Sequence, residues 1–266
     1  MAKTDRQIPF YLGTMGFSYK DWNGIFYPPG MDSKDYLGYY SRIFASVEID
    51  STFYGSPRKS TIQRWLSETP ADFKFSLKVP RTITHELGLV NAWSLMAEFI
   101  ETIRLLGEQL GVILIQFPPS FSISGFEKLG LFLKTLPGDL RYAIEVRDQS
   151  WYIAEAEVEK LLAEYRVAWA ATQYPHLPAK IHQCSDFAYI RWIGQHGSFR
   201  RHDHERIDRT EDLQKWWVDI QEAAQLMNAV YGYFNNDYAG YAVGTALKFR
   251  AIAGIPLEMP QQPKLF

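Results

Sequence analysis

The sequence has little of what several classes of protein require. It contains one cysteine, Cys184, in 266 residues, which excludes an intramolecular disulfide and a cysteine metal cluster. Its 28 basic and 30 acidic residues give a net charge of -2, so a global positive field for nucleic acid is absent. No apolar run reaches the ~18 residues of a membrane span, and the start lacks a signal-peptide core. We therefore expect a cytoplasmic protein without membrane segments.

Two further features are absent from the sequence: a glycine-rich loop that would bind a nucleotide phosphate, and histidines placed to bind a metal ion. The first predicted strand is followed only by Gly13 and Gly16, not by a glycine-rich phosphate loop, which argues against an open nucleotide-binding sheet. No predicted strand ends in a histidine, and His202 and His204 lack the i, i+4 spacing of helical metal ligands. We therefore expect no metal and no cofactor, although a pair of glutamates, Glu48 and Glu145, leaves a hard cation open as an alternative.

What the sequence does contain is a regular alternation of strand and helix patterns. The predicted strands are 10–14, 46–50, 73–80, 111–119, 141–148, 167–172, 187–193 and 229–236. Helical patterns follow most of them, at 32–44, 58–68, 91–108, 124–136, 154–165, 210–227 and 240–253. Such alternation indicates a parallel sheet, and eight units predict a single TIM-type (β/α)8 barrel over residues 1–254. Residues 255–266 are proline-rich and predict an extended tail.

Polar side chains gather where the predicted strands end. They are Glu48, Asp50, Lys78, Gln116, Glu145, Arg147, Arg191, Asn235, Asn236 and Asp237. Barrel enzymes place their chemistry at this end of the strands, so we expect these side chains to face one polar mouth. Buried acids need partners, and the lysine and the two arginines are the available ones. A purely structural salt-bridge network is the alternative. Trp22 and Tyr54, in nearby loops, are candidates to stack on a ligand.

Six motifs, in order over about residues 10–252, resemble a known family. They are GFSYKDWNGIFYPPG, VEIDSTFYGSP, FKFSLKVPRTITHE, LIQFPPSF, EVRDQSW and YFNND. The series is similar to domain-of-unknown-function family 72, the YecE-like proteins, and the resemblance implies a TIM-type barrel without an established activity. By motif, it implies polar family positions at Glu48, Ser51, Tyr54, Lys78, Gln116, Glu145, Arg147, Asn235 and Asn236. Relatives usually read Arg-x-His-Gly in the seventh strand, where this chain has Ile193, so a histidine-dependent mechanism is not expected unless His196 substitutes.

The last residues carry a separate pattern. Gln262, Leu265 and Phe266 fit a Q-x-x-L-F series that resembles the peptides that bind the bacterial sliding clamp, although Pro263 replaces the more usual leucine. In such peptides the glutamine anchors one edge of a pocket and the two apolar residues fill it. We therefore expect the tail to bind a sliding clamp and to bring the protein to DNA.

These features favour an enzyme that acts on a phosphorylated or nucleic-acid substrate, in the manner of a phosphodiesterase. Glu48, Glu145 and Lys78 would be catalytic, as acid or base and as the cation beside them. The expected substrate-binding residues are Trp22, Ser51, Tyr54, Gln116, Arg147, Arg191, Asn235 and Asn236. Two alternatives stay open: a carbohydrate-active hydrolase that uses Glu48 and Glu145 as its carboxylate pair, and a non-catalytic module that binds a small ligand.

Overall fold

The strand-forming runs of the sequence make short parallel strands in this computed structural model, which describes residues 8–256. The strands are β1 (Phe10–Thr14), β2 (Ser46–Ile49), β3 (Lys74–Lys78), β4 (Leu110–Gln116), β5 (Arg141–Glu145), β6 (Ala168–Trp169), β7 (Ala171–Gln173), β8 (Phe187–Trp192) and β9 (Ala229–Phe234). Each predicted strand is present, and the one predicted at 167–172 is interrupted at Ala170, which separates β6 from β7.

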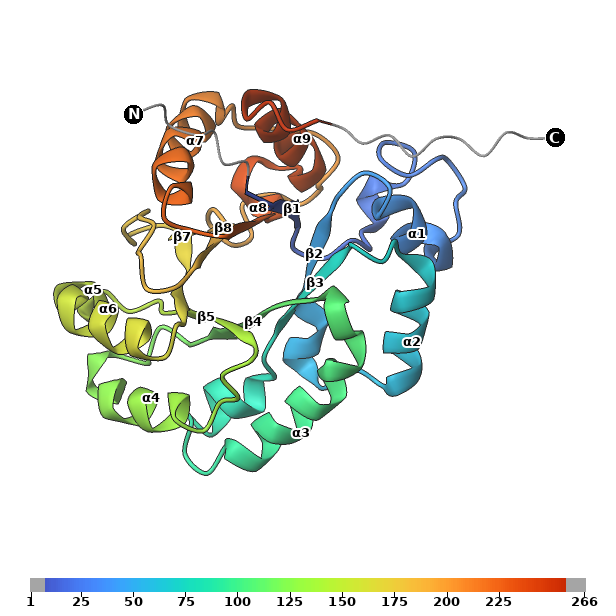
Figure 1. Ribbon diagram of the computed structural model, residues 1–266. Coiled ribbons are helices and arrows are strands. Elements are labelled where there is room, and N and C mark those ends of the chain that lie inside the picture. The colour runs from blue at the N-terminus through green and yellow to red at the C-terminus, as the bar shows by residue number, and fades with distance from the viewer. Residues whose placement is uncertain (1–7, 257–266) are drawn as a thin grey trace, which may run out of the picture.

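Helices lie around the strands, which occupy the centre of the molecule (Figure 1). They are α1 (Tyr36–Tyr40), α2 (Lys59–Glu68), α3 (Trp93–Ile103), α4 (Phe126–Leu133), α5 (Ser150–Ile153), α6 (Glu155–Glu164), α7 (Thr210–Ala224), α8 (Asn236–Ala239) and α9 (Ala242–Ile252). Short turns of helix are η1 (Lys20–Trp22), η2 (Ser33–Asp35), η3 (Asp50–Tyr54), η4 (Thr82–Glu86), η5 (Arg104–Gln109) and η6 (Ile123–Gly125). No helix in the described residues is long and apolar enough to cross a membrane.

The helices pack because their apolar residues share one side. In α7, Leu213, Trp216 and Ile220 are buried at the i, i+3, i+7 spacing of a single helical face. In α2, the buried Trp65 stacks on Phe75 of β3, with 5.4 Å between ring centres. Burial of aromatic side chains in this way contributes strongly to the stability of the core, and it holds α2 against the strand that follows it.

The strands pair in two parallel sheets. One has the order β2-β3-β4-β5-β6 and the other β1-β9-β8-β7. The sheets meet at a single bridge between Met15 and Glu48, where the Gly16 amide donates to the Glu48 carbonyl at 2.8 Å. They meet again at Ala170, whose amide donates to the Ile144 carbonyl at 2.9 Å. The fold is therefore α/β with parallel sheets, and the pairing does not form the one continuous closed sheet of a complete barrel.

Strand alternation sends side chains into two separate apolar clusters. In β4, Ile113 and Ile115 belong to the larger cluster, while Val112 and Leu114 belong to the smaller one on the opposite face. Because successive side chains of a strand point to opposite faces, a residue between two members of the larger cluster faces the smaller one. Glu48, Glu145 and Arg191 each lie between two residues of the larger cluster, so their side chains share the opposite face.

Candidate functional site

Arg191 lies at the centre of the polar residues that end the strands. Its side chain is 3% exposed on β8, between Ile190 and Trp192 of the larger apolar cluster. Nε and Nη2 donate to the two carboxylate oxygens of Glu48 at 2.9 and 2.7 Å, and Nη1 donates to Oε2 of Glu145. Since Glu48 is on β2 and Glu145 on β5, one guanidinium joins three strands.

Further hydrogen bonds hold both carboxylates in place. The Tyr189 hydroxyl donates to Glu48 Oε2 at 2.6 Å, and Nε of Arg147 donates to Glu145 Oε1 at 2.6 Å. Thr172 Oγ1 donates to the other oxygen of Glu145 at 3.3 Å. Glu48 and Glu145 are 0% and 1% exposed, so neither carboxylate reaches the surface. In this arrangement they orient the two arginines, as buried carboxylates do when fully paired.

The same surroundings push the pKa values of the two carboxyl groups apart. Burial raises the pKa of Glu48 to about 7; Arg191 opposes the rise and Asp50 adds to it. Burial also acts to raise the pKa of Glu145, but the charges of Arg147 and Arg191 outweigh it and lower the pKa to about 2. One carboxylate is therefore charged at every physiological pH, while the other titrates near neutrality.

Lys78, at the end of β3, is a partly buried cation without a carboxylate bound to it. Within residues 8–256 its ammonium makes no hydrogen bond or ion pair, and it lies 4.0 Å from the centre of the Phe53 ring. Burial lowers the pKa of Lys78 and the positive charge of Arg191 lowers it further, while the charges of Asp50, Glu145 and Glu48 oppose the fall without bonding to the ammonium. We call Glu48, Lys78, Glu145, Arg147 and Arg191 the strand-end cluster.

Asp50 is a partly exposed carboxylate beside this cluster. Its side chain is 38% exposed, and Oδ1 lies 3.8 Å from Nη2 of Arg191. On the other side, Arg191 Nη2 and Nδ2 of Asn235 both contact the sulfur of Met15, at 3.5 and 3.4 Å. A thioether is a weak acceptor, so the Asn235 amide keeps most of its capacity to donate to a ligand.

The remaining residues that the sequence predicted to bind substrate or a partner differ in how far their side chains are exposed. The Trp22 ring is 0% exposed and packs on Tyr19, so the structure shows loop packing for it and no face open to a ligand. Tyr54 is 80% exposed, and Ser51 is exposed on the same turn, η3. Gln116 is buried, and its amide donates to the Phe117 carbonyl. Gln262, Leu265 and Phe266 lie outside the described residues.

The comparisons with known proteins agree on one family. The family model for "Protein of unknown function DUF72" matches residues 11–265. The chain belongs to this family. Its relatives include the UPF0759 protein YunF of Bacillus subtilis (strain 168), which is 30% identical over an alignment of 285 positions that covers 96% of this chain and 99% of YunF. The UPF0759 protein YecE of Escherichia coli (strain K12) is 32% identical over 152 residues, and this match spans 57% of the chain and only 53% of YecE.

Solved structures of DUF72 proteins have the same fold. The chain matches one from Thermotoga maritima with a TM-score of 0.76 and 29% identity, over 92% of this chain and 99% of that one. It matches one from Enterococcus faecalis with a TM-score of 0.74 at 21% identity, over 94% of this chain and 99% of that one. At that identity the second match shows the fold alone. None of these names states an activity, and a shared fold does not determine the reaction, so the chemistry depends on the geometry of the site.

Sequence reasoning missed several polar residues of this DUF72 chain. His85, in η4, has its pKa lowered by burial and by the charges of Lys78, Arg81 and Arg147, so it lies near two of the three cations of the strand-end cluster. The polar run Thr82–Glu86, directly after the third predicted strand, was the available signal. Tyr189 offered no signal, because a tyrosine within an apolar strand is indistinguishable from a core residue until its partner, here Glu48, is known.

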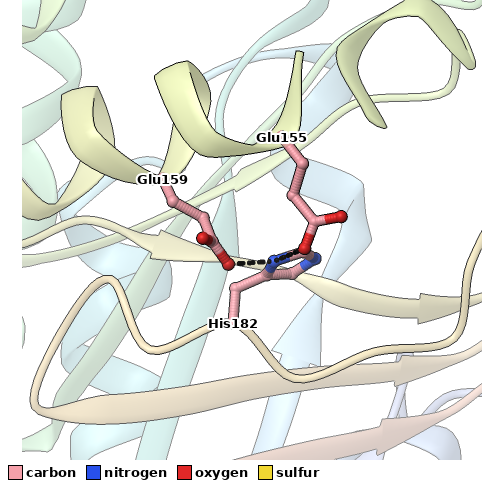
Figure 2. Close-up of side chains that lie close together, drawn as sticks. All are labelled: Glu155, Glu159 and His182. Atoms are coloured by element: carbon pink, nitrogen blue, oxygen red, sulfur yellow. Dashed lines mark hydrogen bonds and ion pairs between the residues drawn. The ribbon is translucent and has the colours of Figure 1, made fainter. Parts of the chain in front are cut away.

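Figure 2 shows a group of side chains outside the strand-end cluster that has metal-ligand types. Glu155 and Glu159 of α6 face His182, whose Nδ1 is 2.9 Å from Glu159 Oε1 and 3.7 Å from Glu155 Oε1. The imidazole stacks on Trp169 at 4.1 Å, and burial lowers its pKa. However, the Lys180 ammonium bonds the same oxygen of Glu155. Because a lysine already supplies the positive charge, we interpret this group as an ion-pair cluster.

Proposed function

We propose that this DUF72 chain is an enzyme that acts on a phosphorylated substrate bound at the strand-end cluster. The observation that carries the proposal is Lys78, a partly buried ammonium with no carboxylate bound to it in the described chain. Burying a cation without a partner is costly, and burial lowers the pKa of this lysine accordingly. A phosphate group would supply the missing partner, which is a typical arrangement in sites that bind anions.

Arg147 supports the same interpretation. Its Nε is bonded to Glu145, whereas Nη1 and Nη2 make no hydrogen bond to any described residue, and its side chain is 11% exposed. The guanidinium carbon lies 4.2 Å from the centre of the Tyr174 ring, a cation–π contact that limits its movement. A guanidinium held in this way presents a planar pair of donors that matches two phosphate oxygens.

A cavity next to His85 gives room for a substrate on this side. Its volume is about 260 Å³, and its lining includes Ser122, Ser124 and Lys128 from the region of η6 and α4. The lining is polar and carries a further cation, which is consistent with an anionic ligand on the His85 side of the strand-end cluster.

The chemistry we propose is phosphodiesterase-like hydrolysis, with Asp50 as general base. Asp50 is the partly exposed carboxylate near Arg191, so it is placed to take a proton from the attacking water as Lys78 and Arg147 neutralise the phosphate oxygens. As the water oxygen bonds to phosphorus, the P–O bond to the leaving alcohol breaks and the alcohol oxygen takes a proton from solvent. Glu48 and Glu145 are the acid and base candidates from the sequence. Both carboxylates are buried and bonded to Arg191, so we assign them a different role, which is to hold Arg147 and Arg191 in position.

The test measures binding of inorganic phosphate by calorimetry and turnover of bis(p-nitrophenyl) phosphate. Lys78→Met is expected to lower phosphate affinity at least tenfold, since it removes a charge-assisted contact, whereas Lys215→Met, on the exposed side of α7, should change nothing. Asp50→Asn is expected to abolish turnover of the ester and to leave the affinity for inorganic phosphate unchanged. Equal phosphate affinity in the wild type and Lys78→Met would reject the anion site. Binding without turnover of any phosphate ester would favour the non-catalytic module.

The carbohydrate-hydrolase alternative has less support. A glycosidase needs one carboxyl group that donates a proton to the leaving oxygen and a second on the other side of the sugar. Glu48 and Glu145 are both buried and both bonded to Arg191, so neither carboxyl is placed against a bound sugar.

We also propose that the two sheets together form a TIM-type (β/α)8 barrel. The Met15–Glu48 bridge and the continuous segment from β6 through Ala170 to β7 link the sheets at both edges. The approach of β1 to β2 is close, since a Cβ on Gly13 would lie 1.9 Å from the Ser46 carbonyl oxygen. Amide hydrogen exchange would test closure: slow exchange of the Gly16 amide is expected, and fast exchange would indicate open sheets.

Clamp binding by the tail, and with it association with DNA in the cytoplasm, is a separate proposal that rests on the sequence pattern of Gln262, Leu265 and Phe266. Surface plasmon resonance with an immobilised bacterial sliding clamp tests it. The change Leu265→Ala with Phe266→Ala should abolish binding, while Gln261→Ala, just outside the pattern, should not. Binding that is indifferent to both changes would reject the tail as the clamp ligand.

A further inference from the structure

A second set of polar residues lies at the ends of β1, β9 and β8, which are neighbours in one sheet. It consists of Tyr19 from the loop after β1, His202 from the loop after β8, and Asn235, Asn236 and Asp237 directly after β9. We call these five residues the β9-side group. The phosphate site proposed above does not use them.

Three buried polar atoms of this group make no hydrogen bond with the described chain. They are Nδ2 of Asn236, Oδ1 of Asp237 and Nε2 of His202. Asn236 and Asp237 are 3% and 9% exposed. His202 Nε2 and Asp237 Oδ1 face each other at 3.6 Å, which is beyond hydrogen-bond distance. Buried polar atoms are normally hydrogen-bonded, so three such atoms in one small group point to an external partner.

The Asn236 and Asp237 side chains are held at their other ends, so this part of the group is preorganised. Asn236 Oδ1 accepts the Ala242 amide at 3.0 Å, and Asp237 Oδ2 accepts the Gly197 amide at 2.9 Å. The backbone amide of His202 donates to Oδ2 of Asp21 at 2.9 Å, which fixes the loop that carries the imidazole. Asn236 and Asp237 therefore each have one side-chain end bonded to the backbone and one atom that makes no hydrogen bond within the described residues, as in binding sites whose ligand-contacting residues are held by neighbouring groups.

The β9-side group is continuous with the strand-end cluster. Burial raises the pKa of Tyr19, the charges of Asp50, Glu48 and Asp237 add to the rise, and the nearby Asn236 side chain opposes it, so the hydroxyl lies among the three carboxylates and beside Asn236. The Met15 sulfur contacts both Arg191 and Asn235. A ligand whose phosphate lies at Lys78 would therefore extend over Asp50 toward Asn236.

The unpartnered atoms include a donor, an acceptor and an imidazole nitrogen that can be either. A hydroxyl group both donates and accepts, so it matches such a set, whereas a bare metal ion would face the Asn236 amide hydrogens. We propose that the β9-side group binds the hydroxyl groups of the substrate, which is therefore a polyhydroxylated phosphate of the sugar-phosphate class. This inference rests on the proposed function, because the phosphate site positions the other end of the ligand.

The experiment measures, by calorimetry, the binding of a panel of pentose and hexose phosphates, the matching free sugars, ethyl phosphate and inorganic phosphate. At least one sugar phosphate should bind tenfold or more tightly than ethyl phosphate, because a site built for hydroxyl groups discriminates against ligands that lack them. Asn236→Asp and Asp237→Asn keep the side-chain shape and should abolish this preference, while inorganic phosphate binds as before. Asp72→Asn, exposed just before β3 at the opposite end of the strands, is the matched control.

Because Asn236 and Asp237 are buried, unfolding of their variants is checked by circular dichroism. His202→Gln, whose side chain is 24% exposed, is a second variant that should also lower the preference. Ethyl phosphate that binds as tightly as every sugar phosphate would overturn the inference while leaving the phosphate site intact. Free sugars that bind through Asp237, without any effect of phosphate or of Lys78→Met, would reject the proposed function and retain the hydroxyl site. No binding by any member of the panel would overturn both.

Discussion

Replacing Arg191 with methionine would remove the one cation that both buried carboxylates share. The substitution keeps a long side chain but loses the two bonds to Glu48, at 2.9 and 2.7 Å, and the bond to Glu145. Removing one partner of a buried ion pair costs about 3–5 kcal/mol, because an uncompensated charge stays in the interior. We expect a loss of that size in the free energy of unfolding, which is a large part of the total for a typical domain.

The loss should depend on pH in a defined direction. In the Arg191→Met variant Glu48 loses its cation, so its folded-state pKa, already raised to about 7, rises further, whereas Glu145 keeps its bond to Arg147. A group with a raised folded pKa contributes stability at low pH and loses it as the pH rises through the folded value. In the wild type, by contrast, the pKa of Glu145 is lowered to about 2 and its contribution is constant above pH 5. The deficit should therefore be larger at pH 8 than at pH 5.

Urea unfolding followed by tryptophan fluorescence, at pH 8 and pH 5, measures this deficit. The matched control is Arg104→Met, which breaks a bidentate pair with Asp139 at 2.7 and 2.8 Å on the exposed surface and should leave the urea midpoint nearly unchanged. A deficit below about 1 kcal/mol for Arg191→Met, or one that is the same at both pH values, would refute the reasoning from buried charge.

Three further changes test other parts of the structure. Gly13→Ala should destabilise the protein by about 1–3 kcal/mol in urea unfolding, since the new Cβ would lie 1.9 Å from the Ser46 carbonyl oxygen. The control, Gly38→Ala, would make only ordinary contacts and should be tolerated. Equal effects of the two changes would contradict this prediction. Glu48 has a pKa raised to about 7, so its stabilising contribution is lost as the pH rises from 4.5 through 7, and Glu48→Gln should flatten the fall in stability between pH 5 and pH 8. An unchanged pH profile would count against that shift. Lys78→Met should raise the thermal midpoint while it weakens phosphate binding, because burial of this ammonium opposes folding; a lowered midpoint would indicate a structural role for the lysine.

The alternation of the strands made much of the site predictable. Glu48, Glu145 and Arg191 each lie between two apolar residues of their strands, so the period of two places all three side chains on the face opposite the larger apolar cluster. Parallel strands then bring their carboxyl ends to one edge, which is why the strand-end residues could be grouped before any contact was known.

Which side chains pair, and which stay open, was decided only by the tertiary structure. Arg191 and Glu48 are 143 positions apart in the chain, and a local pattern carries no information about contacts at that separation. The same limit explains Trp22, whose loop position resembled a ligand contact until packing on Tyr19 buried its ring. The sequence alone thus determined the strands, the helices and the polar edge, because these depend on short-range periodicity. Packing between distant segments decided that Arg191 bonds both glutamates and that Nδ2 of Asn236 makes no hydrogen bond within the described residues.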